Sequence, residues 1–88
     1  MKLKFEKDFL KDLKKLRNEK LKSEIISVIF ESEKASNLYQ INHIKKLTGY
    51  KTYYRIKLGD YRIGIEFVKE EIIFVVFSHR KDIYRKFP

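Results

Sequence analysis

Cations gather at regular spacing in the stretch YYRIKLGDYRIGIEF. Arg55 and Lys57 alternate with apolar residues, and Arg62 follows two positions after Gly59-Asp60. If Gly59 and Asp60 form a two-residue hairpin turn, Lys57 pairs directly with Arg62. Like charges that lie opposite one another destabilise a hairpin, whereas an anion bound between them turns their repulsion into attraction. Because guanidinium groups bind phosphate oxygens in pairs, this spacing predicts a phosphate-binding surface.

The alternation of residue types assigns the two faces of this hairpin. One face collects apolar side chains and is expected to cover helices: Tyr54, Ile56, Leu58, Tyr61, Ile63 and Ile65. The other face collects Arg55, Lys57 and Arg62. Gly64 is expected opposite Arg55, where it would leave a hollow in which a ligand could approach the backbone. The alternative interpretation is a solvated strand face that carries Lys and Arg only for solubility.

A second polar cluster, SHRKDIYRKF, follows the last apolar run. It places His79 and Arg80 at the end of a strand, and Tyr84 shortly after them. Arg85 and Lys86 are expected to add electrostatic attraction for a polyanion. The two histidines of the chain show no metal-ligand spacing, so this cluster predicts no metal site.

Composition limits the class of protein. The 88 residues are 43% hydrophobic and are expected to form a single domain, 1–88. The absence of Cys suits a reducing compartment, and the cytoplasm is the expected location. No run of about 18 apolar residues predicts a membrane span, and the charge pattern of the N-terminal residues is not the one expected of a signal peptide. Lys and Arg number 21 against 12 Asp and Glu, and the net charge of +9 favours a nucleic-acid partner.

The rest of the chain predicts the elements that position the hairpin. MKLKFE alternates like a short strand, and two groups of apolar residues at helical spacing follow, separated by RNEK: Phe9, Leu10, Leu13 and Leu16, then Leu21, Ile25, Val28 and Ile29. Residues 35–51 have no sustained period and are interpreted as a connection that has room for a short helical turn. Strands are expected at 52–58, 61–68 and 72–78, the last of them central or buried on both sides because IIFVVF is apolar throughout.

This order of elements predicts an α+β fold. A small antiparallel sheet is expected, made of the N-terminal strand and the three C-terminal strands, with the helix pair packed on one face.

Several enzyme classes are not expected. The chain has no GxxxxGK[ST] loop for nucleotide triphosphates, no Ser–His–Asp arrangement, no Cys nucleophile and no cluster of acids for two-metal cleavage. If the protein cuts a nucleic acid, it must do so without a metal ion. RNA makes this feasible because its own 2′-hydroxyl can attack the adjacent phosphorus. We therefore expect neither a metal nor a cofactor.

Taken together, YYRIKLGDYRIGIEF and IIFVVFSHRKDIYRKF resemble the RelE/ParE superfamily of bacterial toxins from type II toxin–antitoxin pairs. The usual pattern of that family is a Tyr-[Arg/Lys]-x-[Arg/Lys]-x-Gly-x-Tyr-Arg hairpin, a hydrophobic strand, and His-Arg-x-x-x-Tyr. Both blocks occur here in order, and the resemblance covers the whole chain. It implies a RelE-like fold with the N-terminal strand and helix pair described above.

The RelE branch consists of ribosome-dependent messenger-RNA endonucleases. The resemblance implies that transcripts are cleaved in the ribosomal decoding site through a 2′,3′-cyclic phosphate, which inhibits translation. By motif position, Arg55 and Lys57 match the paired cations of the first hairpin strand, and Arg62 matches the arginine that stabilises the phosphoryl transition state. Arg80 matches the arginine that protonates the leaving oxygen. Tyr84 matches the tyrosine that orients the substrate or stacks on it.

The resemblance also implies a division of roles. Lys57 is the candidate for activating the attacking hydroxyl, because crowding by neighbouring cations favours its neutral form. His79 is a candidate for assisting proton transfer. The expected catalytic residues are Lys57, Arg62, Arg80 and Tyr84. The residues expected to bind RNA or phosphate are Arg55, His79, Arg85 and Lys86.

Two other functions remain open. A ParE-like toxin, which inhibits DNA gyrase without enzymatic activity, would share the fold and much of HRKDIY, although it has no need of convergent cations. A simple basic RNA-binding domain, or an inactive toxin relic, is the third interpretation. A toxin of either branch implies a cognate antitoxin, expected to be an acidic or amphipathic segment that wraps the helices and masks the basic face.

Overall fold

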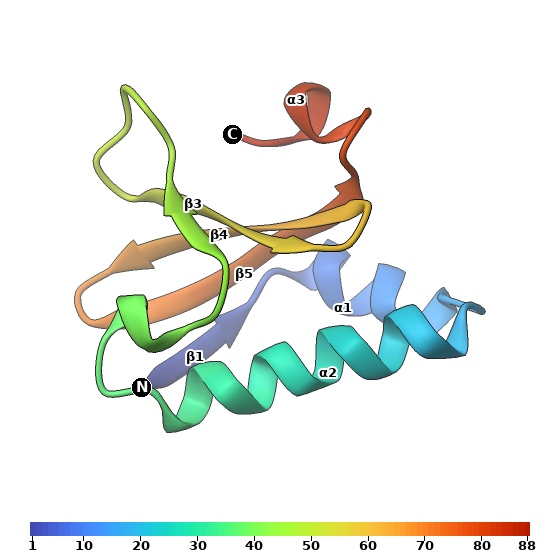
Figure 1. The fold of residues 1–88 in the computed structure, drawn as a ribbon, viewed down its shortest axis with the longest axis horizontal. Helices are drawn as coiled ribbons and strands as arrows, with labels where there is room; N and C mark the ends of the chain where they lie inside the picture. Colours follow the sequence, from blue (N-terminus) through green and yellow to red (C-terminus); the bar gives the residue numbers. More distant parts are fainter.

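A five-stranded sheet carries two helices on one face and a short helix on the other (Figure 1). The computed structural model describes residues 1–88. In chain order the elements are β1 (Lys2–Phe5), α1 (Lys7–Lys15), α2 (Glu19–Lys34), the 3-10 helix η1 (Leu38–Gln40), β2 (Ile44–Lys46), β3 (Tyr53–Leu58), β4 (Tyr61–Val68), β5 (Glu71–His79) and α3 (Ile83–Lys86).

The strands lie side by side in the order β1-β5-β4-β3-β2. The predicted α+β fold is confirmed, with β5 between β1 and β4 as expected for an apolar run. Two features differ from the prediction: β2 adds a fifth strand at the edge, and β1 pairs with β5 in parallel. After the helices the chain enters the sheet at β2, and β2, β3, β4 and β5 then pair antiparallel in chain order. Strand β5 lies beside β1 and runs in the same direction.

Helices α1 and α2 cover one face of the sheet and form the core with it. Helix α2 begins after Asn18, whose side-chain oxygen accepts a hydrogen bond from the N–H of Leu21 at 3.0 Å. The buried apolar residues form one cluster: Phe9, Leu21, Ile25, Val28, Ala35, Leu38, Ile41, Tyr54, Ile56, Ile63, Ile65, Ile72 and Phe74. Leu58 and Tyr61 are partly buried against it. The predicted apolar face of the hairpin therefore does cover the helices.

The three α-helices have 9, 16 and 4 residues. None of them combines the length and the apolar character that crossing a bilayer requires.

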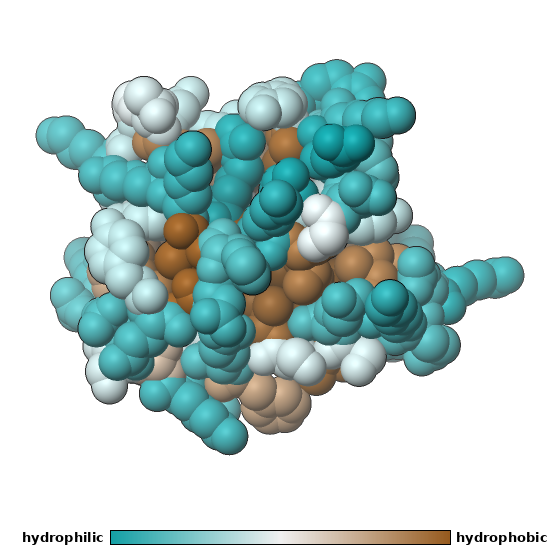
Figure 2. Space-filling model, in the orientation of Figure 1, coloured by the Kyte–Doolittle hydropathy of each residue, from teal (hydrophilic) through white to brown (hydrophobic).

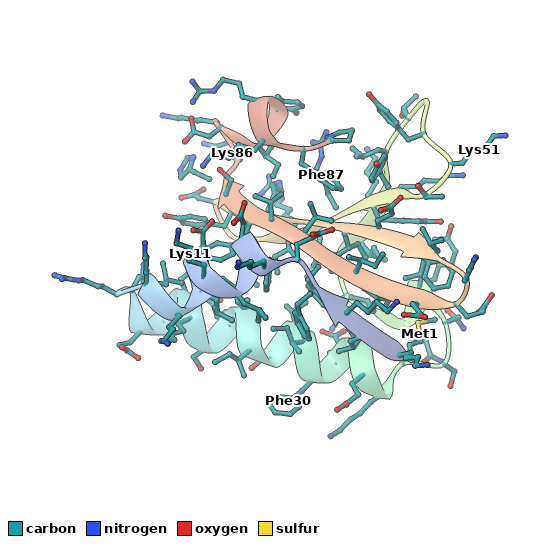
Figure 3. The ribbon with its side chains drawn as sticks, turned by 180° about the vertical axis from the view of Figure 1, so that it is seen from behind. Met1, Lys11, Phe30, Lys51, Lys86 and Phe87 are labelled. Carbon is teal, nitrogen blue, oxygen red and sulfur yellow. The ribbon has the colours of Figure 1, made fainter.

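The C-terminal residues fill the space over Gly64. The Phe87 side chain is only 2% exposed, and a Cβ on Gly64 would lie 2.6 Å from its Cγ. The expectation of a ligand-accessible hollow at Gly64 was wrong, because the missing side chain admits the Phe87 ring instead. Figure 3 shows Phe87 at the C-terminal end of the ribbon, on the side of the sheet away from α1 and α2.

This contact holds the short helix α3 in place. Ile83, at the start of α3, is 1% exposed, and its carbonyl oxygen accepts a hydrogen bond from the N–H of Phe87 at 2.9 Å. Two buried apolar residues thus fix a helix of four residues that would not be stable alone.

Gly64→Ala is expected to lower the free energy of unfolding by about 1–3 kcal/mol, because the added methyl group overlaps the Phe87 ring. Urea denaturation followed by circular dichroism measures the change. In a chain that already carries Phe87→Ala, the same substitution is expected to cost less than about 0.5 kcal/mol, since the ring is gone. Equal costs in the two backgrounds would contradict the packing of Phe87 on Gly64.

Candidate functional site

The β3–β4 hairpin has the predicted register. Lys57 lies opposite Arg62, and Arg55 lies opposite Gly64. Gly59 opens the two-residue turn with a φ of 59°, a conformation that costs Gly little but strains residues with a Cβ. The opposed cations predicted from the sequence are therefore confirmed.

The edge strand β2 adds residues that the sequence analysis had left in a connection. Lys45 is the cross-strand partner of Arg55, and partners in a sheet lie on the same face. The carbonyl oxygen of His43 accepts a hydrogen bond from the N–H of Lys57 at 3.1 Å, which places the start of β2 beside Lys57. A three-residue strand is too short to show an alternating pattern, so no local signal in the sequence predicted that Lys45 would join this face.

A cleft of about 580 Å³ opens over β2, β3 and β4. Five cations and no carboxylate line it. The lining contains four predicted site residues, Arg55, Lys57, Arg62 and Tyr84, together with His43, Ile44, Lys45, Lys46, Leu47, Thr48 and Tyr50. The loop before β3 and helix α3 rise on the side of the sheet away from α1 and α2 (Figure 1), and hydrophilic side chains crowd this part of the molecule in Figure 2. The cleft is thus an electropositive hollow between the loop and α3.

Tyr84 covers Arg55 from α3. The central carbon of the Arg55 guanidinium lies 4.7 Å from the centre of the Tyr84 ring, within the range of a cation–π interaction. The Nε of Arg55 is buried and has no hydrogen-bond partner in the chain, whereas Tyr84 is 73% exposed. The pair presents an aromatic surface backed by a positive charge, on which a flat, electron-rich ring can stack.

Arg62 is held by the turn beside it. Its Nη1 donates to the carbonyl oxygens of Gly59 and Tyr61, each at 2.8 Å. Both bonds use one nitrogen, so the other N–H groups of the guanidinium remain free to bind an anion. Arg62 is therefore a preorganised cation, while the neighbouring Lys57 extends into solvent.

The four other predicted residues, His79, Arg80, Arg85 and Lys86, do not line the cleft. Arg80 is tied to the hairpin turn: its N–H donates to the carbonyl oxygen of Asp60 at 2.7 Å, and its Nε lies 3.7 Å from the Asp60 carboxylate. The ring of His79 packs edge-on against Tyr61, with the ring centres 5.4 Å apart. These two residues lie beside the Gly59-Asp60 turn that joins β3 to β4, outside the cleft.

Arg85 and Lys86 lie on the exposed side of α3. Arg85 forms an ion pair with Asp82 in the turn that begins this helix. Both cations remain accessible to solvent and add to the positive charge around α3.

The chemistry of the cleft follows from its lining. Arg55 and Arg62 can bind phosphoryl oxygens, and Tyr84 can stack on a base, so a phosphodiester link of a nucleic acid fits this set of groups. No three His, Asp or Glu side chains lie together in a way that could hold a metal ion.

Comparison with known sequences identifies relatives along nearly the whole chain. The family model for the ParE toxin of type II toxin–antitoxin systems (parDE) matches residues 3–84. Toxin RelE3 of Methanocaldococcus jannaschii is 44% identical over 89 residues, which covers 100% of both chains.

Solved structures share the fold. A chain of the RelB-RelE antitoxin-toxin complex from Methanococcus jannaschii is 42% identical and superposes with a TM-score of 0.77, covering 97% of this chain and 99% of that one. A chain of the archaeal RelE-RelB complex from Pyrococcus horikoshii OT3 has the same fold, with a TM-score of 0.69 at 22% identity over 90% of this chain and 93% of that one. The chain therefore belongs to the RelE/ParE superfamily of toxins from type II toxin–antitoxin systems.

Proposed function

We propose that the protein is the toxin of a toxin–antitoxin pair and acts as a metal-independent endoribonuclease on messenger RNA in the ribosomal decoding site. The observation that carries the proposal is the convergence of Arg55, Lys57, Arg62 and Tyr84 on one cleft. The 44% identity to a toxin named RelE3 favours the RelE branch.

In the proposed reaction the 2′-hydroxyl of one nucleotide attacks the adjacent phosphorus. A bond forms between that phosphorus and the 2′-oxygen, the bond to the 5′-oxygen of the next nucleotide breaks, and the products are a 2′,3′-cyclic phosphate and a 5′-hydroxyl. Lys57 takes the proton from the attacking hydroxyl. Arg62 stabilises the charge that develops on the phosphoryl oxygens, and its fixed Nη1 limits the reorganisation that this requires.

The remaining residues position the RNA and complete the proton transfer. Arg55 and Tyr84 hold the nucleotide, the first through its charge and the second by stacking. Arg80 protonates the leaving oxygen, for which its side chain must leave Asp60. That pair is exposed and its atoms are 3.7 Å apart, so little free energy opposes the movement. His79 assists beside it, and Arg85 and Lys86 attract flanking phosphates.

A ParE-like inhibitor of DNA gyrase is the second candidate, favoured by the match to the ParE toxin family model. Such a toxin would bind its target protein and leave RNA intact. A cleft with five cations and a tyrosine stacked on an arginine is better suited to a polynucleotide strand than to a protein surface.

We also propose that a cognate antitoxin covers the helical face. Ile26 and Phe30 lie one turn apart on α2 and are 38% and 58% exposed, and Figure 3 shows Phe30 pointing away from the sheet. An amphipathic segment with acidic residues would bury this apolar pair and match the net charge of +9. The solved relative from Methanococcus jannaschii is an antitoxin-toxin complex, RelB-RelE, which supports the existence of a protein partner.

Arg62→Ala is expected to lower the cleavage of translated messages by about 100-fold or more, because the developing charge loses a preorganised donor. Primer extension on a translated message after brief induction maps the cuts. Arg17→Ala removes an exposed arginine between α1 and α2 and should leave the cuts unchanged. Wild-type cutting by the Arg62 variant would contradict the mechanism. Intact messages together with blocked gyrase supercoiling would favour the second candidate.

Substitutions of Tyr84 separate stacking from hydrogen bonding. Tyr84→Ala is expected to reduce cleavage by about 10-fold or more, since stacking on an aromatic ring contributes about 1–3 kcal/mol per base. Tyr84→Phe keeps the ring over Arg55 and should retain cleavage within about twofold. The same primer-extension assay measures both. Equal losses in the two variants would assign the role to the hydroxyl group.

Phe30→Asp is expected to weaken antitoxin binding by about 10-fold or more, because it places a charge in an apolar contact. Isothermal titration of the purified toxin with its cognate antitoxin measures the affinity. Phe30→Tyr keeps the ring and serves as the control. Unchanged affinity of the Asp variant would exclude this part of α2 from the interface.

A further inference from the structure

We propose that Tyr50 is a second stacking platform, so that the cleft binds two neighbouring nucleotides of single-stranded RNA, one base on Tyr84 and the next on Tyr50. The inference rests on the proposed function, because that function supplies RNA as the ligand.

A hydrogen-bonded turn fixes Tyr50 at the wall of the cleft. The N–H of Tyr50 donates to the carbonyl oxygen of Leu47 at 3.3 Å, and the N–H of Leu47 donates to the carbonyl oxygen of Tyr53 at 2.9 Å. Gly49, inside this turn, has a φ of 88°, and no atom lies within 4 Å of where its Cβ would be. Gly is therefore required here for its backbone conformation and not for space, and the turn it allows places the Tyr50 ring.

A chain of aromatic contacts supports the ring from one side. Tyr50 packs against Tyr53 with the ring centres 5.6 Å apart at 73°, and Tyr53 packs against Phe87 at 5.3 Å and 84°. Phe87 is buried on the sheet, so the support is rigid. Tyr50 is nevertheless 46% exposed. A ring that is held along one edge and open elsewhere can accept a base without losing much conformational freedom.

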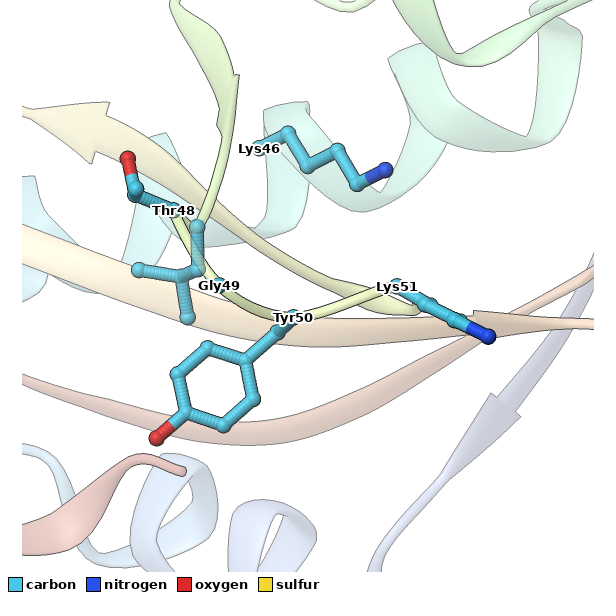
Figure 4. A pocket seen from close by; sticks show the side chains of 6 residues that line it. Lys46, Thr48, Gly49, Tyr50 and Lys51 are labelled. Carbon is cyan, nitrogen blue, oxygen red and sulfur yellow. The ribbon is translucent and has the colours of Figure 1, made fainter.

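A further cation lies in the loop that carries Tyr50. The loop lines a second, shallow hollow of about 390 Å³, which shares Lys46 and Tyr50 among others with the main cleft and adds Lys51. Figure 4 shows Tyr50 projecting from this loop, with the amines of Lys46 and Lys51 directed away from its ring. No carboxylate lines either hollow. A strand that passes over Tyr50 therefore meets one more positive charge, Lys51, beside Lys46 of the main cleft, and these two amines can bind its next phosphates.

The arrangement favours a single strand over a duplex. Tyr84 and Tyr50 come from α3 and from the loop, whereas Arg55, Lys57 and Arg62 lie on the strands between them. In single-stranded RNA each base is free to stack on a side chain, whereas in a duplex it is held by pairing and by its neighbours.

The test measures binding without cleavage. A short single-stranded RNA that carries fluorescein and 2′-O-methyl groups cannot undergo 2′-hydroxyl attack, and its fluorescence anisotropy reports binding to the full chain. Tyr50→Ala is expected to weaken binding by about 10-fold, and Tyr50→Phe by less than about twofold. Tyr39→Ala removes a tyrosine that is 73% exposed outside the cleft and should leave binding unchanged. Thermal melting verifies that each variant is folded.

An abasic scan of the same RNA locates the contact. Removing the base that stacks on Tyr50 should weaken binding by the wild type by about 10-fold and have no further effect on Tyr50→Ala. Removing the base at a different position, the one that stacks on Tyr84, should weaken binding by the wild type and have no further effect on the affinity of Tyr84→Ala. The platform is overturned if Tyr50→Ala binds the RNA as tightly as the wild type does. It is also overturned if each abasic position lowers the affinity of Tyr50→Ala as much as it lowers that of the wild type.

Failure of the platform and failure of the nuclease proposal give different results. Binding that depends on Tyr50, in a protein that leaves translated messages intact, supports the platform and overturns the nuclease. If the protein cleaves translated messages but Tyr50→Ala binds RNA as tightly as the wild type, the platform is overturned and the nuclease proposal stands. A wild-type protein that binds no RNA overturns the platform whatever the cleavage assay gives.

Discussion

An aromatic ring packed on a bare backbone joins the fold to the site. Because Gly64 has no side chain, Phe87 lies directly on β4 and is almost fully buried. On one side Phe87 holds α3, which places Tyr84 over Arg55. On the other side it supports Tyr53, at the base of the loop that forms the opposite wall. Both walls of the cleft therefore depend on Gly64, where the absence of a side chain leaves room for Phe87.

Repulsion among the cations of the cleft lowers the free energy of unfolding, and the apolar core on the opposite face of the sheet offsets this loss. Five cations line the hollow without a carboxylate among them, and their repulsion raises the free energy of the unliganded protein. Water reduces this repulsion because most of these side chains are exposed, and the apolar core lies on the other side of the sheet. A bound phosphodiester would relieve the remaining repulsion. The affinity for such a ligand should therefore fall as salt concentration rises.

The sequence predicted the elements in which a local pattern repeats. The hairpin register was predictable because alternation and the turn at Gly59 fix it together, and every pair from Tyr54–Ile65 to Leu58–Tyr61 is the expected one. Strand β2 and helix α3 have three and four residues, fewer than a period needs to be recognised. The place of Phe87 depends on contacts across the fold that no local pattern contains. Half of the expected site residues line the cleft. The others, His79, Arg80, Arg85 and Lys86, lie outside it, and their places too depend on contacts across the fold.

The parallel pairing of β1 with β5 sets the order in which the molecule can assemble. Lys2 lies opposite Glu71, so the first strand has no partner until β5 has been synthesised. Contacts between such distant residues also slow folding, because a long loop must close first. Helices α1 and α2 leave the exit tunnel with no sheet to cover, and β2, β3, β4, β5 and α3 follow them. The cleft is therefore complete only after α3, the last of the elements that line it, has left the exit tunnel.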